Sequence, residues 1–238
     1  TSSLVGSEMC IRDSYITEQF NLDKEIPAGT HSVYLKFTPF EGKSFVANID
    51  NFTFGDTEVN ESIKISRSVR VEGYQISTTL GGNRVVGSVE PTINGKEVKN
   101  WGFVYGLAKA NGNATGITND DMRVDSDNNF IKAYESTSVG TSDKKFGSSA
   151  TATYFVRTMK FASYTSNAFG AEYKVRAYAV LADGSYVYSN VSDYSIFGIA
   201  ESLYNGKLMN TYEAHNYLYN NILKVVDSSY ETVSYTHL

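Results

Sequence analysis

The sequence predicts an all-β fold, a β-sandwich, followed by a short helical tail. The first observation is a predicted hairpin at residues 172–190, where apolar and polar residues alternate on both sides of Asp183-Gly184. An Asp-Gly pair between alternating runs is the strongest short-range hairpin signal, and it suits a type I′ turn. Second, about seven short alternating segments with Gly and Asn turns between them precede residue 198, as expected for a sandwich. Third, the apolar spacing becomes helical after residue 199.

The two ends of the chain carry related sequences. Residues 9–13, Met-Cys-Ile-Arg-Asp, can be encoded by ATG TGT ATA AGA GAC, whose reverse complement translates as Val-Ser-Tyr-Thr-His, the sequence of residues 233–237. The ends of a natural protein have no reason to share this relationship. We therefore interpret residues 1–14 and 233–238 as translated sequencing adapter and exclude them from the fold prediction. We expect the gene to have been read as a fragment, with any signal peptide or further domain outside it.

The composition argues against several classes of partner. Leaving out Glu8, Arg12 and Asp13 changes the formal net charge from −5 to −4, and this weak acidic balance argues against nucleic acid and anionic membranes. No apolar run approaches the ~20 residues that span a bilayer. The single cysteine, Cys10, lies in the excluded segment, so neither a disulfide framework nor a thiolate metal site is expected.

Residues 15–56 contain two predicted strands, at residues 31–37 and 45–54. Two strands cannot bury a core alone, so we expect this segment to be the end of a larger sheet. The strings Gly29-Thr-His-Ser-Val-Tyr-Leu-Lys-Phe37 and Asn48-Ile-Asp-Asn-Phe-Thr-Phe54 resemble the C-terminal strands of family 6 carbohydrate-binding modules. The resemblance implies a truncated jelly-roll sandwich that binds polysaccharide, with the family's sugar-stacking aromatic residues upstream.

That resemblance also implies a sugar contact and a metal ligand. By position in the motif, Asn48 would contact sugar, and Asp50 would help to hold a structural Ca²⁺. The alternative for Asn48 is a sheet-edge residue bonded to a neighbouring loop, and the alternative for Asp50 is a solvated carboxylate in a turn. Because Ca²⁺ takes six to eight oxygen ligands, one aspartate does not define a site.

A polar linker is predicted at residues 57–67, before a second domain at residues 68–198. A break in the alternation at Gly73 predicts a bulge. Residues 109–129 are rich in Asn, Gly, Asp and Thr and are predicted to form a long loop. The predicted strands cover residues 69–78, 84–89, 101–105 and 151–161, and then the hairpin at 172–190 and a last strand through Tyr194 and Ile196.

Parts of this second domain resemble fibronectin type III-like domains of bacterial surface proteins. The strings are Trp101-Gly-Phe-Val-Tyr-Gly106 and Tyr173-Lys-Val-Arg-Ala-Tyr178, followed by Asp183-Gly184 and Tyr188-Ser189. The resemblance implies that Trp101 is a core residue and that Tyr173 stands where a tyrosine corner bonds back to the backbone. The insertion at residues 109–145 is longer than such domains usually carry, which leaves the strand order open.

Residues 199–230 form the predicted helical tail. Ala200 and Leu203 suit a short helix, and Asn210 or Thr211 could cap a second helix. The apolar residues of this second helix recur at helical spacing: Ala214, Leu218, Ile222 and Val225. Such a helix needs a surface to pack on, either the sandwich or a further domain.

The sequence offers no catalytic motif. His31 and His215 are the only histidines outside the excluded ends, and His215 has no serine or carboxylate at a motif spacing. No G-x-S-x-G, H-E-x-x-H or phosphate-binding loop occurs. A glycosidase needs two opposed carboxylates, but most acidic residues here fall in predicted loops. We therefore expect that this chain is not an enzyme.

An acidic stretch suggests a second calcium hypothesis. Asp125-x-Asp127-x-Asn129 begins like a calcium loop, but Phe130 and Ser136 stand where the helix–loop–helix motif needs Gly and Glu. The remaining alternatives are a looser loop site and a solvated turn, of which we favour the turn.

Four aromatic residues have two interpretations each. Trp101 could stack on a sugar ring, but it shares an alternating face with Phe103 and Tyr105, so we favour a core position. Three tyrosines of the hairpin could contact a ligand, but cross-strand pairs on a sheet surface are favoured. These are Tyr178, Tyr186 and Tyr188.

These expectations combine into one hypothesis. The chain is expected to be a non-catalytic carbohydrate-binding or accessory fragment of a secreted bacterial polysaccharide-acting protein, extracellular or on the cell surface, monomeric, and partnered by polysaccharide. The alternative is a structural spacer or adhesin module with no glycan site of its own.

Overall fold

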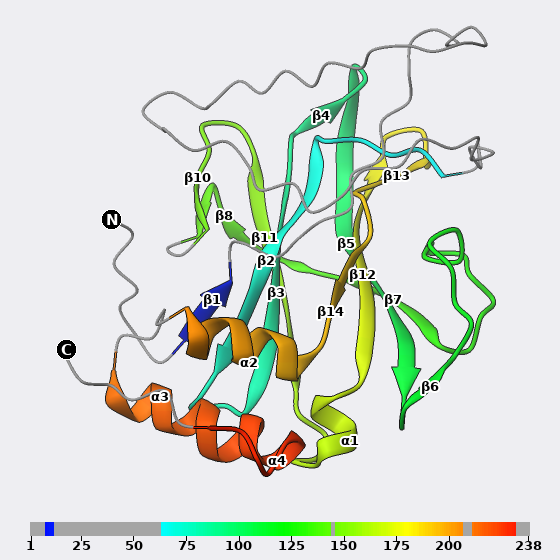
Figure 1. The fold of residues 1–238 in the computed structure, drawn as a ribbon. Coiled ribbons are helices and arrows are strands. Elements are labelled where there is room, and N and C mark those ends of the chain that lie inside the picture. Colours follow the sequence, from blue (N-terminus) through cyan, green and yellow to red (C-terminus); the bar gives the residue numbers. More distant parts are fainter. Residues whose placement is uncertain (1–7, 12–62, 144–145, 207–210, 232–238) are drawn as a thin grey trace, which may run out of the picture. The chain divides into compact units, whose positions relative to one another are not determined.

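The computed structural model describes residues 8–11, 63–143, 146–206 and 211–231, which belong to one compact unit. Antiparallel strands are the commonest secondary structure of these residues and form two facing sheets, so the prediction of an all-β sandwich with a short helical C-terminal part is confirmed (Figure 1). Asn48, Asp50 and His31, which the sequence analysis singled out, lie outside the described residues.

The first sheet has the strand order β1–β2–β3–β11–β8; its edge strand β1 comes from the segment 1–14 that the fold prediction left out, and it pairs with β2. Its strands are β1 (Glu8–Ile11), β2 (Val69–Ser77), β3 (Gly82–Val89), β11 (Thr153–Lys160) and β8 (Thr137–Gly140). The pair β9 (Ser142–Asp143) and β10 (Gly147–Ser148) forms a separate two-stranded ribbon. The order β2–β3–β11–β8 is that of strands A, B, E and D in immunoglobulin-type sandwiches.

The second sheet is built on two long neighbouring strands, β5 (Lys96–Ala110) and β12 (Glu172–Leu181). On the far side of β12 lie β13 (Tyr186–Tyr188) and β14 (Ser192–Tyr194), and on the far side of β5 lies β7 (Ile131–Glu135). Two short strands, β4 (Thr92–Ile93) and β6 (Asn113–Ala114), pair with the two ends of β5.

The period-two alternation of the strands creates the core. Phe103 of β5 and Phe155 of β11 are fully buried, and their ring centroids lie 4.9 Å apart across the two sheets. Val175 and Ala177 of β12 join them in one buried cluster. Each fully buried side chain of this size contributes about 1.5–3 kcal/mol, so this alternation is the main source of stability.

The turn after β12 differs from the predicted type I′ turn. Gly184 has a φ of 81°, but Asp183 is not among the residues with positive φ. Leu181 donates its N–H to the carbonyl of Ser185, which makes a three-residue loop with glycine in the left-handed position. The type I′ prediction was wrong because the Asp183 carboxylate accepts bonds from the N–H and hydroxyl of Ser185, which favours a right-handed conformation at Asp183.

The predicted bulge at Gly73 is confirmed. The pairing of β2 with β3 shifts register between Val71 and Gly73, and Gly73 has a φ of 149°. Only glycine adopts this backbone conformation at little cost, so the glycine fixes where the strand bends.

The predicted loop at 109–129 begins as a hairpin and then folds onto the second sheet. Asn111 and Gly112 have φ of 51° and 79°, which allows the tight turn between β5 and β6. Beyond β6, Ile117 and Met122 pack on the outer face of β5. A Cβ on Gly106 would stand 2.6 Å from the Met122 sulfur, so the glycine makes room for the loop.

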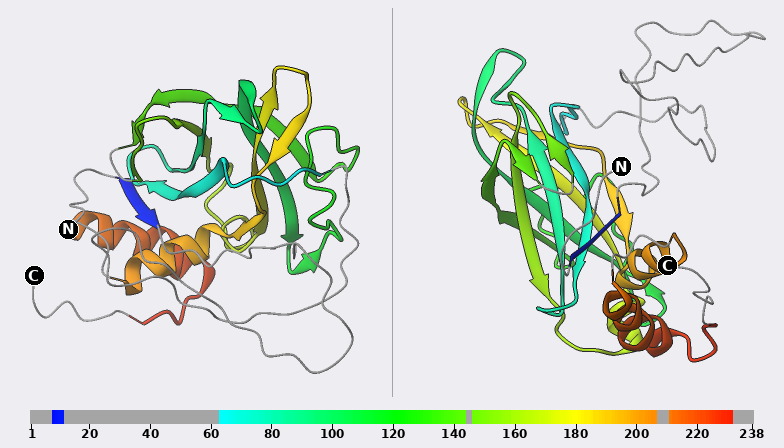
Figure 2. Two further views of the ribbon diagram at one scale, coloured as in Figure 1. Left: turned by 90° about the horizontal axis from the view of Figure 1, so that it is seen from above. Right: turned by 90° about the vertical axis from the view of Figure 1, so that its left-hand side faces the viewer.

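The helices close one end of the sandwich (Figures 1 and 2). They are α1 (Ser166–Phe169), α2 (Ile196–Asn205), α3 (Tyr212–Leu218), η1 (Tyr219–Leu223) and α4 (Lys224–Val226). Leu203, Leu218 and Ile222 belong to the same buried cluster as the strands, so the sandwich is the surface on which the helical segment packs.

Two helix starts can be compared with the sequence predictions. Thr211 caps α3, because its hydroxyl accepts the N–H of Ala214, as predicted for one of two candidates. The prediction that the last strand continues through Ile196 was wrong. Ser195 caps a helix by accepting the N–H of Gly198, and α2 therefore begins at Ile196.

Part of the segment predicted as a linker pairs with the second sheet. Ser66 donates its N–H to the carbonyl of Tyr188, and Tyr188 donates its N–H to the carbonyl of Lys64, both at 2.8 Å. Ile65 thereby forms a parallel bridge with Tyr188, and Ile63 is buried. The segment covers the outer edge of β13, which would otherwise present unpaired backbone groups.

Candidate ligand pocket at Trp101

A pocket of about 200 Å³ opens where the ends of β3, β5 and β11 meet, at the end of the sandwich opposite the helices. Its lining combines one large aromatic ring, two carboxylates and one hydroxyl with apolar side chains. The lining residues are Val89, Glu90, Pro91, Glu97, Val98, Trp101 and Thr153.

The connection from β3 to β5 builds one wall of the pocket. Val98 donates its N–H to the carbonyl of Pro91, and β4 pairs with the start of β5 around Asn94-Gly95. Both turn residues have positive φ, 51° and 75°, as a type I′ turn requires. This short hairpin brings Glu90 and Glu97 to the same pocket although they are separated in sequence by a turn.

Trp101 belongs to the core and to the pocket. Its ring centroid lies 6.3 Å from that of Phe155, and its side chain packs against the main buried cluster. The same side chain is half-buried and lines the pocket. Its indole N–H is buried and has no hydrogen-bond partner among the described residues, and such a donor costs about 1–3 kcal/mol until an acceptor reaches it.

The two carboxylates are held differently. Glu90 is half-buried, and its Oε2 accepts the hydroxyl of Thr151 at 2.6 Å. Glu97 pairs with Lys99 at 2.6 Å, but the two side chains are 62% and 53% exposed. An ion pair this exposed is worth about 0–1 kcal/mol, so Glu97 exchanges partners at little cost.

The tyrosines of the closing hairpin form cross-strand pairs, as favoured by the sequence analysis. Tyr178 lies directly opposite Tyr188, and they are 4% and 2% exposed. Burial raises the pKa of the Tyr178 phenol to about 12. Tyr186 is 37% exposed and packs edge-on against Tyr178 at 6.1 Å. Of these three rings, only that of Tyr186 is open to a ligand.

Tyr173 stands near the start of β12, where a tyrosine corner was implied. Its ring stacks on Tyr194 of the adjacent strand with 5.4 Å between centroids. Within the described ranges, no hydrogen bond joins its hydroxyl to a backbone carbonyl.

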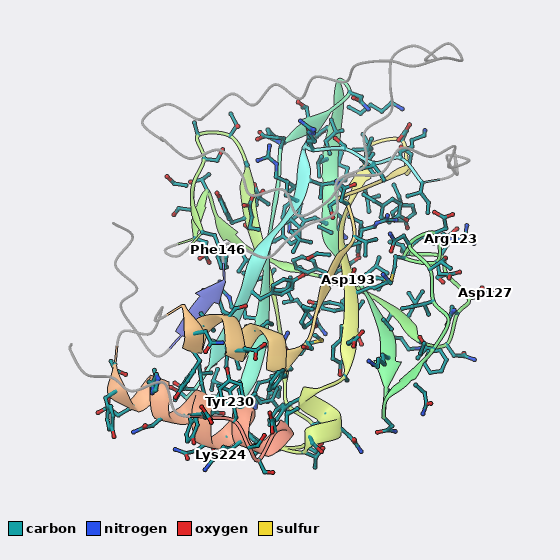
Figure 3. All side chains as sticks on the ribbon, viewed as in Figure 1. Arg123, Asp127, Phe146, Asp193, Lys224 and Tyr230 are labelled. Carbon is teal, nitrogen blue, oxygen red and sulfur yellow. The ribbon has the colours of Figure 1, made fainter. Side chains whose placement is uncertain are left out.

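The carboxylates of the acidic loop at Asp121, Asp125 and Asp127 do not converge on one site. Asp121 accepts the N–H and hydroxyl of Thr118, which lowers the pKa of this carboxyl. Asp125 lies 3.5 Å from Arg123, and Figure 3 shows Arg123 and Asp127 at the outer edge of the loop. In the part of the chain that the structure describes, no group of three or more His, Cys, Asp or Glu residues is placed to hold a metal ion.

A buried arginine fastens this loop to the sheet. Arg176 is 3% exposed, and its Nη1 donates to the carbonyl of Met122 at 3.2 Å. Its guanidinium carbon lies 5.7 Å from the ring centroid of Tyr188, and burial lowers its pKa to about 10. The alternation pattern placed Arg176 on the outer face of β12, but it gave no sign that a loop covers this face.

His215 belongs to the helical packing. It is 7% exposed, and its ring stacks on that of Tyr204 with 4.1 Å between centroids. Burial lowers the pKa of His215, because the charged imidazolium loses its hydration there.

Sequence reasoning missed Glu90 and Glu97 as pocket residues. The available signal was the Pro91 to Lys96 turn, which predicts that its two flanking residues lie close together. The position of Thr153 beside them depends on the pairing of β11 with β3, which the sequence does not reveal.

No protein-family model, curated protein or solved structure matches this chain. The helices among the described residues are all too short or too polar to cross a bilayer.

Proposed function

We propose that this chain is a non-catalytic glycan-binding accessory module of a secreted polysaccharide-acting protein, and that the Trp101 pocket contacts the sugar. The observation that carries this proposal is the composition of the pocket. A pyranose ring presents an apolar C–H face to an aromatic ring and hydroxyl groups at its rim. The pocket offers Trp101 for the face and Glu90, Glu97 and Thr153 for the hydroxyl groups.

The hydrogen-bonding capacity of the pocket supports a polyhydroxylated ligand. Carboxylates only accept hydrogen bonds, whereas a threonine hydroxyl both donates and accepts. A sugar hydroxyl also does both, so one sugar residue can donate to Glu90 and exchange a hydrogen bond with Thr153. The volume of about 200 Å³ suits a single sugar residue and does not accommodate a long buried chain.

Retention of the full chain on a panel of insoluble polysaccharides tests the proposal. Trp101 is the single tryptophan, so ligand binding should also change the intrinsic fluorescence of the protein. We expect retention on at least one polysaccharide, weakened by Trp101→Phe and by Glu90→Gln. Glu172→Gln, which alters an exposed ion pair with Lys109 away from the pocket, is the matched control.

A spacer or adhesin module is the second candidate, and one observation favours it. Both outer faces of the sandwich are partly covered by segments of the same chain. Ile117 and Met122 cover the second sheet, and Phe146 packs with Val86 and Tyr154 on the first sheet (Figure 3). Absence of retention on every polysaccharide, with no change in fluorescence, would favour this candidate and overturn the glycan-binding proposal.

A further inference from the structure

We infer that the Trp101 pocket selects a sugar bearing a protonated amine, an amino sugar with a free amino group. This inference rests on the proposed function and names the ligand class of the same site. Two of the seven lining residues carry a charge, and both are carboxylates, Glu90 and Glu97. Glu97 is paired with Lys99, so the carboxylate at the pocket without a described cationic partner is Glu90, and an aromatic ring lies in the wall beside it.

An indole beside carboxylates is a favourable environment for an ammonium group. Tryptophan is the best aromatic residue for a cation–π contact with an ammonium group. A carboxylate adds a charge-assisted hydrogen bond, which is about twice as strong as a neutral one. Glu90 and Trp101 together supply both interactions within one pocket.

Both carboxylates can accept a hydrogen bond from an incoming ammonium group. Glu90 uses Oε2 to accept the Thr151 hydroxyl, and no described residue occupies Oε1. Among the described residues, the Glu97 carboxylate pairs with Lys99, and both side chains are more than half exposed. Because so exposed an ion pair is weak, an incoming ammonium group can replace Lys99 at little cost.

The same charges exclude anionic sugars and disfavour neutral ones. A uronic acid would place its carboxylate beside Glu90 and Glu97, and like charges at contact distance repel each other. A neutral hexose forms the hydroxyl contacts but gains no charge-assisted bond. The expected order of affinity is therefore amino sugar, then neutral sugar, then uronic acid.

A lysine side chain is the competing source of an ammonium group. It carries the charge on a flexible methylene chain that has no hydrogen-bonding group besides the ammonium. A free-amine sugar carries hydroxyl groups next to its amine, and these can bond to Thr153 and to the second carboxylate. The mixed polar lining therefore favours the sugar.

The test is calorimetric titration of the full chain with three short oligosaccharides of one linkage: β-linked glucosamine, its N-acetylated form, and glucose. The titration is done at about pH 6, where the amine of glucosamine is protonated. We expect the glucosamine oligomer to bind at least about tenfold more tightly than the other two. Its advantage should shrink with added salt, which screens the carboxylates.

Variants separate this inference from the proposed function. Glu90→Gln and Glu97→Gln should each remove most of the preference for the free amine, whereas Glu172→Gln should leave it unchanged. Circular dichroism of each variant confirms that the fold is retained. Equal affinity for all three oligomers would overturn the amine inference and leave glycan binding standing.

Two further outcomes are decisive. If none of the oligomers and no polysaccharide binds, the proposed function fails together with this inference. If a short lysine-rich peptide binds as tightly as the glucosamine oligomer and depends on the same two glutamates, the pocket recognises ammonium groups of peptides, and the assignment to amino sugars is wrong.

Discussion

Arg84 and Asp143 form an ion pair at 2.9 Å, with 18% and 5% of their side chains exposed. The pair joins β3 to β9, the short strand that begins the segment over the outer face of the first sheet. Arg84 also donates to Gln75 of β2, and Asp143 accepts the N–H of Phe146. One buried contact therefore links three separate parts of the chain.

Replacement of Asp143 should destabilise the fold strongly. Asp143→Asn leaves Arg84 without its charged partner in a site shielded from water, and we expect a loss of about 3 kcal/mol in the free energy of unfolding. Urea denaturation measures the change. Glu172→Gln breaks an ion pair that is about half exposed, and it should cost less than about 1 kcal/mol. Equal losses for the two variants would show that burial of the first pair has no energetic effect.

The packing of the loop on Gly106 can be tested by a double-mutant cycle. Gly106→Ala places a methyl group against the Met122 sulfur and should cost about 1–3 kcal/mol. Met122→Ala removes a fully buried side chain and should cost about 2–5 kcal/mol. The smaller side chain relieves the contact with Met122 but not that with Ile117, whose Cδ1 would lie 2.5 Å from the new Cβ, so the double variant should lose somewhat less than the sum of the two. Strict additivity would contradict the close contact.

The helical segment should unfold together with the sandwich. Leu218 is 0% exposed and lies in the main cluster, so Leu218→Ala should lower the free energy of unfolding by about 2–5 kcal/mol. Trp101 fluorescence reports on the strands and far-ultraviolet circular dichroism reports strongly on the helices, and their transitions should coincide. Leu80→Ala, at a residue 60% exposed, is the control and should change stability by no more than about 0.5 kcal/mol. Separate transitions would show that the helices are an independent appendage.

Alkaline pH should destabilise the protein before its buried tyrosines ionise. The pKa of Tyr178 is about 12 in the folded protein, against 10.0 for a free phenol. Because the folded value is the higher one, the stability it contributes is complete below pH 10 and is lost as the pH rises towards 12. Tyr178→Phe should flatten this part of the stability profile, as measured by urea denaturation at a series of pH values. An unchanged slope would show that Tyr178 does not contribute.

The sequence patterns predicted the strands that are buried on one face with regular alternation. The segments now seen as β2, β3, β5, β11 and β12 were all recognised from their apolar and β-branched residues, although β3 and the middle of β12 are buried on both faces. The strands between residues 131 and 148 were not recognised. They are short and mostly exposed, so their side chains carry no hydrophobic period.

Local side-chain hydrogen bonds explain two places where the sequence pattern was misleading. Apolar Ile196 continued the alternation of the preceding strand, but the hydroxyl of Ser195 favours a helix start. The Asp-Gly pair indicated the hairpin correctly and its turn type incorrectly, because a carboxylate can bond to the backbone two residues ahead.

The candidate pocket was predictable only in part. Trp101 was recognised as a residue with two interpretations, and the structure places it in the core and at the pocket. Glu90 and Glu97 come from a turn, and Thr153 comes from a strand that pairs with β3 across a long stretch of sequence. Long-range pairing of this kind is set by the whole fold, and a single sequence does not encode it in any local pattern.

The parallel bridge between Ile65 and Tyr188 has a mechanical consequence. Tension that runs along residues 64–66, parallel to β13, loads the bonds of Ser66 and Lys64 to Tyr188 in shear, so that they resist it together. Loading of this kind requires several hydrogen bonds to rupture at once instead of one after another. A module attached between a surface and a load would therefore withstand tension at the edge of β13 before the rest of the sandwich comes apart.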